Sequence, residues 1–392
     1  MTRLILHVGP PKCGSTSIQH FFANQKKPCV ENTYYKTLAP LEISELNREE
    51  PSESILTMLT QLFVDKLTRS DVLILSHEYL FECHYAINNI CSLAKDLVTE
   101  IFVVGYSRKQ SEFLISAYSQ WGFRLPYRIK EAAVVFDELE LDSVLFSGLE
   151  QQLITSIAND FYVADYGKYR ILDWYNSYKE ITQLIHESGA VIKCGVLPSK
   201  ESDNTLIQDF CEKSGLTLRD EMKAASQQIL NTSFNPDVIE AMNNAVAFGL
   251  DMPGPHESND VLELLSNNMV KMTNQLSEFL FNLKSYIDTY FLGLNQQYCR
   301  EYGLSETYFT PAARFNKREI LDLIIQEDQQ RTLNNSVVIN NYRMLSAKMI
   351  ELCLQLTKEG GSGSRKDNLP AQLNLKRKVA NIWRALTNYF KH

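Results

Sequence analysis

The segment LILHVGPPKCGSTSIQHFF, from Leu4 to Phe22, constrains the fold more than any other part of the chain. An apolar run leads into a turn rich in glycine and hydroxyl side chains, and a stretch with helical periodicity begins directly after it. A strand that ends in such a turn and opens a helix directs backbone N–H groups and the positive end of the helix dipole at one point. The segment therefore predicts a site for a phosphate or a similar anion.

The side chains of this turn also suit a bound anion. Gly9 and Gly14 let the backbone curve closely around a phosphate, and Lys12 adds a mobile positive charge. Three hydroxyl side chains follow as further donors. The sequence therefore predicts an anion-binding set that consists of Gly9, Lys12, Gly14, Ser15, Thr16 and Ser17.

The composition limits the classes of protein and ligand. With 392 residues, 44% of them hydrophobic, the chain can bury a large core. A net charge of −8 argues against a broad nucleic-acid-binding surface, so we expect a local anion site and no nucleic acid as partner. The eight cysteines are scattered without a CxxC pair, so we expect neither disulfides nor a metal site. The sequence contains no apolar run of about 18 residues and no secretion signal, which favours a cytoplasmic location.

Short apolar runs alternate with helix-like segments over about the first 200 residues. Their near-continuous hydrophobicity is typical of strands buried on both faces of a parallel sheet. We therefore expect an α/β fold, with a P-loop-type parallel sheet flanked by helices. The expected strands are Leu4–Val8, Val72–Ser76, Ile101–Tyr106 and Ala190–Val196, and the expected helices are Thr16–Asn24, Ser54–Lys66, Ala86–Leu97 and Gln110–Trp121.

After residue 217 the strand signals fade, and helix-like segments follow at Asp237–Phe248, Val261–Phe281 and Lys317–Gln330. We therefore expect a helical C-terminal lobe. The predicted domains are an α/β core (1–216), the helical lobe (217–357), a flexible linker (358–374) and a basic amphipathic helix (375–392). The basic helix suits an anionic membrane surface, such as the inner face of the cell membrane, or a partner protein, and equally a helix docked on its own domain.

The order of residues in the first loop separates two classes of phosphate loop. In the ATP- and GTP-binding loop, GxxxxGK[ST], the lysine directly follows the second glycine. Here Ser15 follows Gly14, and the lysine lies inside the loop at Lys12. The segment HVGPPKCGSTSIQ resembles the 5′-phosphosulfate loop of sulfotransferases that use 3′-phosphoadenosine 5′-phosphosulfate (PAPS).

A second segment, IFVVGYSRKQSEFLISAYSQW, carries the same resemblance. Arg108 comes just after the predicted strand Ile101–Tyr106, and Ser116 lies eight residues further on. The resemblance implies that Arg108 and Ser116 bind the 3′-phosphate, the group that distinguishes PAPS from ATP. The segments DYGKYRILDWYNSY, LIQDFCEKSGL and REILDLIIQEDQQRTLNN resemble later landmarks of bacterial glycan-modifying sulfotransferases, and we assign no functional residue in them.

The resemblance implies a complete reaction. PAPS is the sulfuryl donor, adenosine 3′,5′-bisphosphate is the product, and the acceptor is a hydroxyl of a carbohydrate such as a bacterial surface glycan or its precursor. Sulfuryl transfer resembles phosphoryl transfer in requiring in-line attack and stabilisation of charge on the leaving oxygen. Lys12 is the residue expected to neutralise that charge, and the helical lobe is the expected acceptor side.

A hydroxyl nucleophile also benefits from a general base. The predicted strand Val72–Ser76 is followed directly by His77 and Glu78. Ligands bind at the carboxyl ends of strands in an open parallel sheet, so Glu78 is our first candidate for the base and His77 the second. A carboxylate that only caps the next helix is the alternative interpretation of Glu78.

Two other functions are compatible with parts of the sequence. A P-loop kinase that uses ATP would share the strand, loop and helix, although the position of Lys12 and the pair of Arg108 and Ser116 argue against it. A non-catalytic nucleotide-binding scaffold, recruited through its basic C-terminal helix, would keep the fold without turnover. Binding of adenosine 3′,5′-bisphosphate, ATP and ADP discriminates between the two nucleotide classes.

Overall fold

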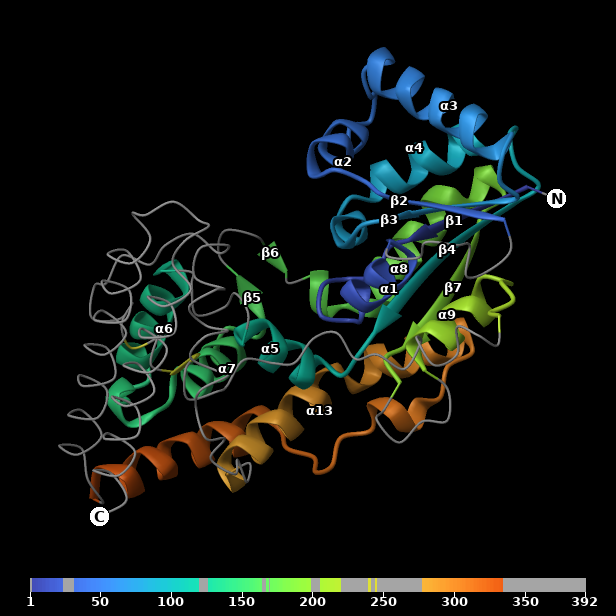
Figure 1. Cartoon of the computed structure of the whole chain (residues 1–392). Helices are drawn as coiled ribbons and strands as arrows, with labels where there is room; N and C mark the ends of the chain where they lie inside the picture. The colour runs from blue at the N-terminus through green and yellow to red at the C-terminus, as the bar shows by residue number, and fades with distance from the viewer. Residues whose placement is uncertain are drawn as a thin grey trace, which may run out of the picture. The chain divides into compact units, whose positions relative to one another are not determined.

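A computed structural model describes most of the first 219 residues and a second stretch near the C-terminus (Figure 1). The described residues are 2–23, 32–119, 126–163, 167–168, 170–198, 205–219, 239–240, 244 and 277–333. The predicted linker 358–374 and the basic helix 375–392 lie outside these ranges. So do most residues of the predicted helices Asp237–Phe248 and Val261–Phe281.

Five parallel strands form the central sheet, in the order β2-β3-β1-β4-β7. Every residue of β3 is buried, and so is all of β1 except its first residue, as expected for aliphatic strands covered on both faces. The predicted α/β fold with a parallel sheet and flanking helices is confirmed. The strands are β1 (Arg3–His7), β2 (Thr33–Thr37), β3 (Val72–Ser76), β4 (Glu100–Ser107) and β7 (Val191–Val196).

The chain order places a topological switch at β1. From β1 the chain passes to β2 and β3 on one side, and then to β4 and β7 on the other. Because all five strands are parallel, their carboxyl ends meet at one edge of the sheet. Ligands of open α/β sheets bind outside that edge, at the point where the strand order reverses.

Helices cover both faces of the sheet. Figure 1 shows α1 and α9 on one face and α3 and α4 on the other. Helix α1 packs against α9, and α4 packs against α2, α3 and α8. These helices are α1 (Ser15–Ala23), α2 (Pro40–Leu46), α3 (Glu53–Leu67), α4 (His84–Ala94), α8 (Trp174–Ile185) and α9 (Leu206–Lys213).

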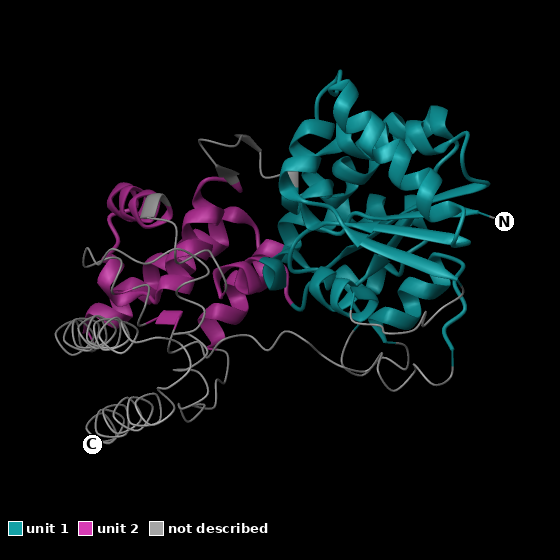
Figure 2. Cartoon of the chain, turned by 45° about the horizontal axis from the view of Figure 1, so that its top comes forward, with its two compact units in different colours: residues 1–113, 163–232, 288–312 teal, residues 114–162, 233–287, 313–392 magenta. Residues whose placement is uncertain are grey.

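The chain divides into two compact units that interleave in the sequence (Figure 2). Unit 1 holds the sheet and consists of residues 1–113, 163–232 and 288–312, and unit 2 consists of 114–162, 233–287 and 313–392. Residues 288–312, which the sequence analysis placed in the helical lobe, thus belong with the sheet. A ring contact within unit 1 gives the physical reason, because Tyr298 stacks on Tyr178 of α8 with ring centroids 5.5 Å apart.

Unit 2 is helical in its described part. The predicted helix Lys317–Gln330 is confirmed within a helical stretch at 317–333. Arg331 of that stretch pairs with Glu150 at 2.9 Å and lies over the ring of Phe146. In the described ranges, no helix is both long and apolar enough to cross a membrane. The remaining helices, two of which contribute residues to both units, are α5 (Gln110–Tyr118), α6 (Pro126–Glu138), α7 (Gly148–Ala158) and α13 (Glu278–Tyr302).

Candidate functional site

The loop between β1 and α1 has the strand–turn–helix geometry that the sequence predicts. The Val8 N–H donates to Val104 O, so β1 stays paired with β4 up to the start of the loop. Lys12 and Gly14 then adopt left-handed φ values of 68° and 90°. The N–H groups of Ser17 and Ile18 donate to Gly14 O and begin the helix. The N–H groups of Ser15 and Thr16, which precede these bonds at the start of α1, therefore have no intrahelical acceptor.

Gly14 is required by both its conformation and its surroundings. Its φ of 90° is one that L-residues with a side chain rarely adopt. An added Cβ would lie 2.4 Å from Cδ2 of Leu206 and 3.0 Å from Cδ1 of Leu197. The loop can close over the end of α9 only because no side chain is present at this position.

We expect Gly14→Ala to lower the free energy of unfolding by about 1–3 kcal/mol more than Gly189→Ala, measured by urea denaturation. Gly189 is the matched control because its φ is 69° and nothing lies within 4 Å of its Cβ position. Both substitutions carry the strain of a positive φ, and only Gly14→Ala adds the steric overlap. Equal losses of unfolding free energy in the two variants would show that Leu206 moves away from the added Cβ at no cost in free energy.

The hydroxyl groups of the loop differ in their surroundings. Ser15 is buried, and its Oγ donates to Gly9 O at 3.3 Å and to Pro10 O at 3.2 Å. Thr16 is exposed and Ser17 is half-buried. In this conformation Ser15 therefore holds the loop backbone, and Thr16 and Ser17 are the better placed donors for a ligand.

A buried histidine lies beneath the loop. Nδ1 of His7 is 2.8 Å from Oγ of Ser76 on the neighbouring strand β3. Burial lowers the pKa of His7 to about 3, so the imidazole is neutral near pH 7. Its Nε2 has no hydrogen-bond partner among the described residues, and a Cβ on Gly9 would lie 3.0 Å from it. Gly9 therefore lets the loop lie close above the imidazole.

Arg108 follows β4 and reaches the same loop. Its Nη1 donates to Lys12 O at 3.1 Å, and its Nη2 donates to Oε2 of Glu112 at 3.2 Å. Nε1–H of Trp174 donates to the backbone oxygen of Arg108 at 3.0 Å. Burial raises the pKa of the Cys13 thiol to about 12, although the positive charges of Arg108 and Lys12 oppose that shift. The loop thus combines two cationic residues with a thiol that stays protonated.

The two residues predicted for the 3′-phosphate are placed in different units. Arg108 lies in unit 1, at the carboxyl edge of the sheet, and is mostly buried. Ser116 is half-buried in α5, in the part of that helix that belongs to unit 2. The contact of Arg108 with the loop is therefore a feature of the structure, and the pairing with Ser116 stays a prediction.

A segment from far along the chain also reaches the end of β4. Nζ of Lys109 donates to Thr310 O at 3.0 Å, which brings the segment that contains Tyr308 to the end of β4. The phenol lies within the electrostatic influence of Arg108 and Glu112, and burial raises the pKa of Tyr308. Sequence reasoning missed Tyr308, because about 200 residues separate it from β4 and no local pattern connects the two.

The candidate bases follow β3 at the same edge of the sheet. The His77 N–H donates to His7 O at 3.3 Å, which ties the end of β3 to the end of β1. Glu78 then begins a 3₁₀ helix, η1 (Glu78–Glu82), and Nδ1 of His77 accepts the Tyr79 N–H at 3.0 Å. Burial lowers the pKa of His77, while the charge of Glu78 opposes that shift. His77 therefore caps the helix as a neutral imidazole.

The described site lies within unit 1 and consists of the loop, Arg108 and the end of β3. No protein-family model, curated protein or solved structure matches this chain.

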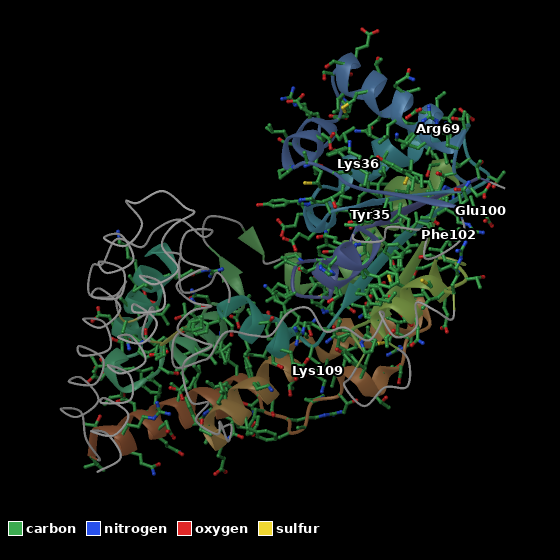
Figure 3. All side chains as sticks on the ribbon, in the orientation of Figure 1. Tyr35, Lys36, Arg69, Glu100, Phe102 and Lys109 are labelled. Atoms are coloured by element: carbon green, nitrogen blue, oxygen red, sulfur yellow. The ribbon has the colours of Figure 1, made fainter. Side chains whose placement is uncertain are left out.

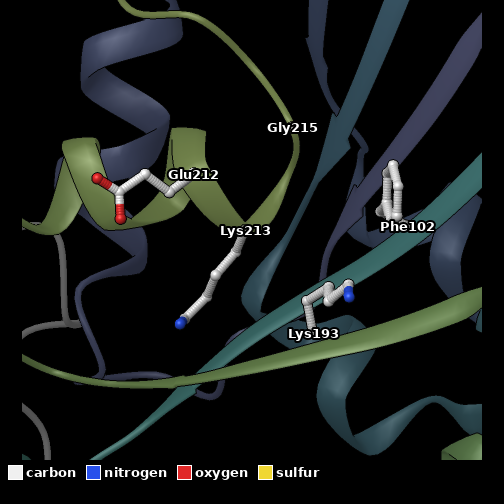
Figure 4. A pocket seen from close by; sticks show the side chains of 5 residues that line it. All are labelled: Phe102, Lys193, Glu212, Lys213 and Gly215. Carbon is white, nitrogen blue, oxygen red and sulfur yellow. The ribbon is translucent and has the colours of Figure 1, made fainter.

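An open pocket of about 440 Å³ lies elsewhere on unit 1, between β4, β7 and α9 (Figure 4). Arg3, the first residue of β1, donates to the backbone oxygen of Gly215 at its rim. Figure 3 shows Phe102, another of its lining residues, near the opposite end of β4 from Lys109. The pocket therefore lies toward the amino ends of the strands, away from the loop. Its lining residues are Phe102, Lys193, Glu212, Lys213 and Gly215.

Proposed function

We propose that this chain is a PAPS-dependent sulfotransferase with a P-loop-type core, which transfers a sulfuryl group to a hydroxyl of a carbohydrate. The observation that carries the proposal is the hydrogen bond from Arg108 to Lys12 O, because it joins the ends of β4 and β1 at the switch point of the sheet. PAPS carries anionic groups at both its 5′ and its 3′ positions. A site for it needs cationic groups from two strand ends, and the loop and Arg108 supply them.

In the proposed reaction, the loop holds the 5′-phosphosulfate. The N-terminal N–H groups of α1 and the hydroxyls of Thr16 and Ser17 bind its oxygens. The acceptor oxygen forms a bond to sulfur as the bond from sulfur to the bridging oxygen breaks, and adenosine 3′,5′-bisphosphate leaves. Lys12 stabilises the negative charge that grows on the bridging oxygen, and the proton of the acceptor hydroxyl passes to the base.

The hydrogen bonds after β3 favour Glu78 over His77 as that base. Because Nδ1 of His77 accepts the Tyr79 N–H, the neutral imidazole carries its proton on Nε2. Such an imidazole has no second lone pair with which to accept a proton from an acceptor. Glu78 directly follows His77 and is only half-buried, so a substrate can reach its carboxylate. We therefore assign Glu78 as the base and His77 as the residue that caps η1.

The acceptor class and the location of the protein rest on the sequence. The resemblance to bacterial glycan-modifying sulfotransferases supports a surface glycan or its precursor as the acceptor. We place the reaction in the cytoplasm, where the basic segment 375–392, predicted from the sequence to be an amphipathic helix, would bring the enzyme to an anionic membrane surface or to a partner protein.

The first test is a calorimetric comparison of adenosine 3′,5′-bisphosphate, ATP and ADP with the full chain. We expect the bisphosphate to bind most tightly, because only this nucleotide offers a 3′-phosphate to Arg108. ATP binding as tightly as the bisphosphate, or more tightly, would favour a kinase and overturn the proposal. An assay of sulfate transfer from PAPS to a glycan acceptor then shows whether the chain is an enzyme or a non-catalytic binding scaffold.

The second test removes the charge of Arg108. Arg108→Gln keeps an N–H donor for Lys12 O, so the loop should keep its shape. We expect binding of adenosine 3′,5′-bisphosphate to weaken by about 1.5–3 kcal/mol, the usual size of a charge-assisted hydrogen bond, while binding of adenosine 5′-phosphate changes little. Calorimetry with both nucleotides measures the difference.

Arg69→Gln is the matched control for this variant. Arg69 is exposed at the end of α3, on a part of unit 1 remote from Lys109, as Figure 3 shows. Its removal should leave both affinities unchanged. If Arg108→Gln weakened the binding of both nucleotides equally, Arg108 would support the loop and not bind a 3′-phosphate.

A further inference from the structure

The guanidinium of Arg108 is shared between two acceptors. Nη1 donates to Lys12 O, and Nη2 pairs with the Glu112 carboxylate in the first turn of α5. The third nitrogen, Nε, is buried and has no partner among the described residues. The side chain of Arg108 is 18% exposed and that of Glu112 is 41% exposed. The arginine is thus mostly buried, while its carboxylate partner is open to solvent.

The two acceptors differ in how easily a ligand can replace them. Lys12 O belongs to the loop backbone, at a residue with a left-handed φ of 68°, and is fixed by the local fold. The Glu112 carboxylate is on a flexible side chain that is 41% exposed, and it contacts Arg108 through one oxygen at 3.2 Å, so water or another anion can replace it. An anion that approaches Arg108 can therefore displace Glu112 at little cost, while Arg108 stays anchored to the loop.

Other polar groups near Glu112 do not compete with it for Arg108. The Asp288 carboxylate accepts the N–H and the Oγ–H of Ser111, at 3.2 and 3.0 Å. The ammonium of Lys109 donates to Thr310 O. Glu112 is thus the carboxylate that occupies the position on Arg108 where an anionic ligand would bind.

We propose that Glu112 holds the place of the 3′-phosphate on Arg108 and, by competing with that phosphate, sets how tightly it binds. This inference rests on the proposed function, in which Arg108 binds that phosphate. A carboxylate and a phosphate can each present two anionic oxygens to a guanidinium, and the phosphate carries more charge. A nucleotide with a 3′-phosphate breaks the ion pair between Glu112 and Arg108 and forms its own ion pair with Arg108. A nucleotide without one leaves Glu112 in place.

The test is Glu112→Gln, which keeps the shape of the side chain and removes its charge. We expect adenosine 3′,5′-bisphosphate to bind about 3- to 10-fold more tightly, because a unit charge about 4 Å from the phosphate is removed in a half-exposed setting. Adenosine 5′-phosphate should change by less than about 2-fold, since it does not displace Glu112. Calorimetry on the full chain measures both affinities.

Asp65→Asn is the matched control. Asp65 pairs with Arg69 four residues later on the surface of unit 1, as Glu112 pairs with Arg108, and it lies in α3. This variant removes the same charge from a similar pair, so it measures the effect of net charge alone. We expect it to leave both affinities unchanged. Glu112→Ala provides a second variant, and it should also tighten binding of the bisphosphate.

Each result has a distinct meaning. If Glu112→Gln leaves the bisphosphate affinity unchanged, or weakens it, Glu112 orients Arg108 and the inference is wrong while the proposed function stands. If Asp65→Asn tightened binding of the bisphosphate as much as Glu112→Gln does, the effect would come from net charge alone. That result would also overturn the inference. If the unaltered chain does not bind the bisphosphate, the proposed function itself fails.

Discussion

Lys12→Ala should lower the rate of sulfate transfer by about 10²–10³-fold and change the affinity for the donor far less. The reason is that the charge on the bridging oxygen appears mainly in the transition state, where the ammonium of Lys12 is proposed to stabilise it. An interaction that strengthens only in the transition state lowers kcat and kcat/KM together when it is removed. Steady-state kinetics with PAPS and a competent glycan acceptor, together with calorimetry of adenosine 3′,5′-bisphosphate, measure the two effects.

Alanine is the suitable replacement because it removes the charge of Lys12 without changing the backbone strain of the loop. Lys12 has a left-handed φ of 68°, and alanine retains the Cβ that is strained there. Glycine would relieve the strain and change the loop as well as the charge. Lys193→Ala is the control, because Lys193 lies in β7 at the pocket toward the amino ends of the strands. Turnover that survives Lys12→Ala would remove the leaving-group role.

The sequence predicted the central strands because their signal is local. In β1 and β3, consecutive aliphatic residues are buried on both faces of the sheet, and periodicity reports that directly. Strand β2, with the sequence TYYKT, was missed. It lies at the edge of the sheet, next to β3 alone, and its residues are half-buried or exposed, so they lack that hydrophobic signature.

The long helix α13 shows a different limit. The sequence placed a helix at Val261–Phe281, and the described helix Glu278–Tyr302 overlaps only the end of that range. Its polar residues serve contacts at long range, such as the reciprocal hydrogen bonds of Asn295 with Gln110 of α5, each at 2.9 Å. Tyr298 likewise accepts a hydrogen bond from Ser107 of β4. Such contacts interrupt the apolar periodicity by which a helix is detected.

The candidate site likewise contains residues that the sequence could predict and contacts that it could not. Lys12 and Arg108 could be predicted because Lys12 lies in the loop after β1, Arg108 directly follows β4, and parallel strands end at one edge of the sheet. The ion pair of Arg108 with Glu112 and the approach of Tyr308 depend on side-chain geometry, which strand order does not specify. Ser15 is also predicted from the sequence as an anion donor, and that role stays a prediction, because its hydroxyl donates to the loop backbone in this structure.

Glu78→Gln should lower the rate of sulfate transfer by about 10²–10⁴-fold and leave binding of the donor intact, because glutamine keeps the shape of the side chain and lacks the basicity. His77→Ala should affect transfer much less. It should instead lower the stability of the chain, since the Tyr79 N–H loses the side-chain acceptor that caps η1. Transfer rates with a glycan acceptor, and urea unfolding of both variants, separate the two roles. The opposite ranking of the two rates, with donor binding intact, would move the base to His77 and require its Nδ1 to release Tyr79 during the reaction.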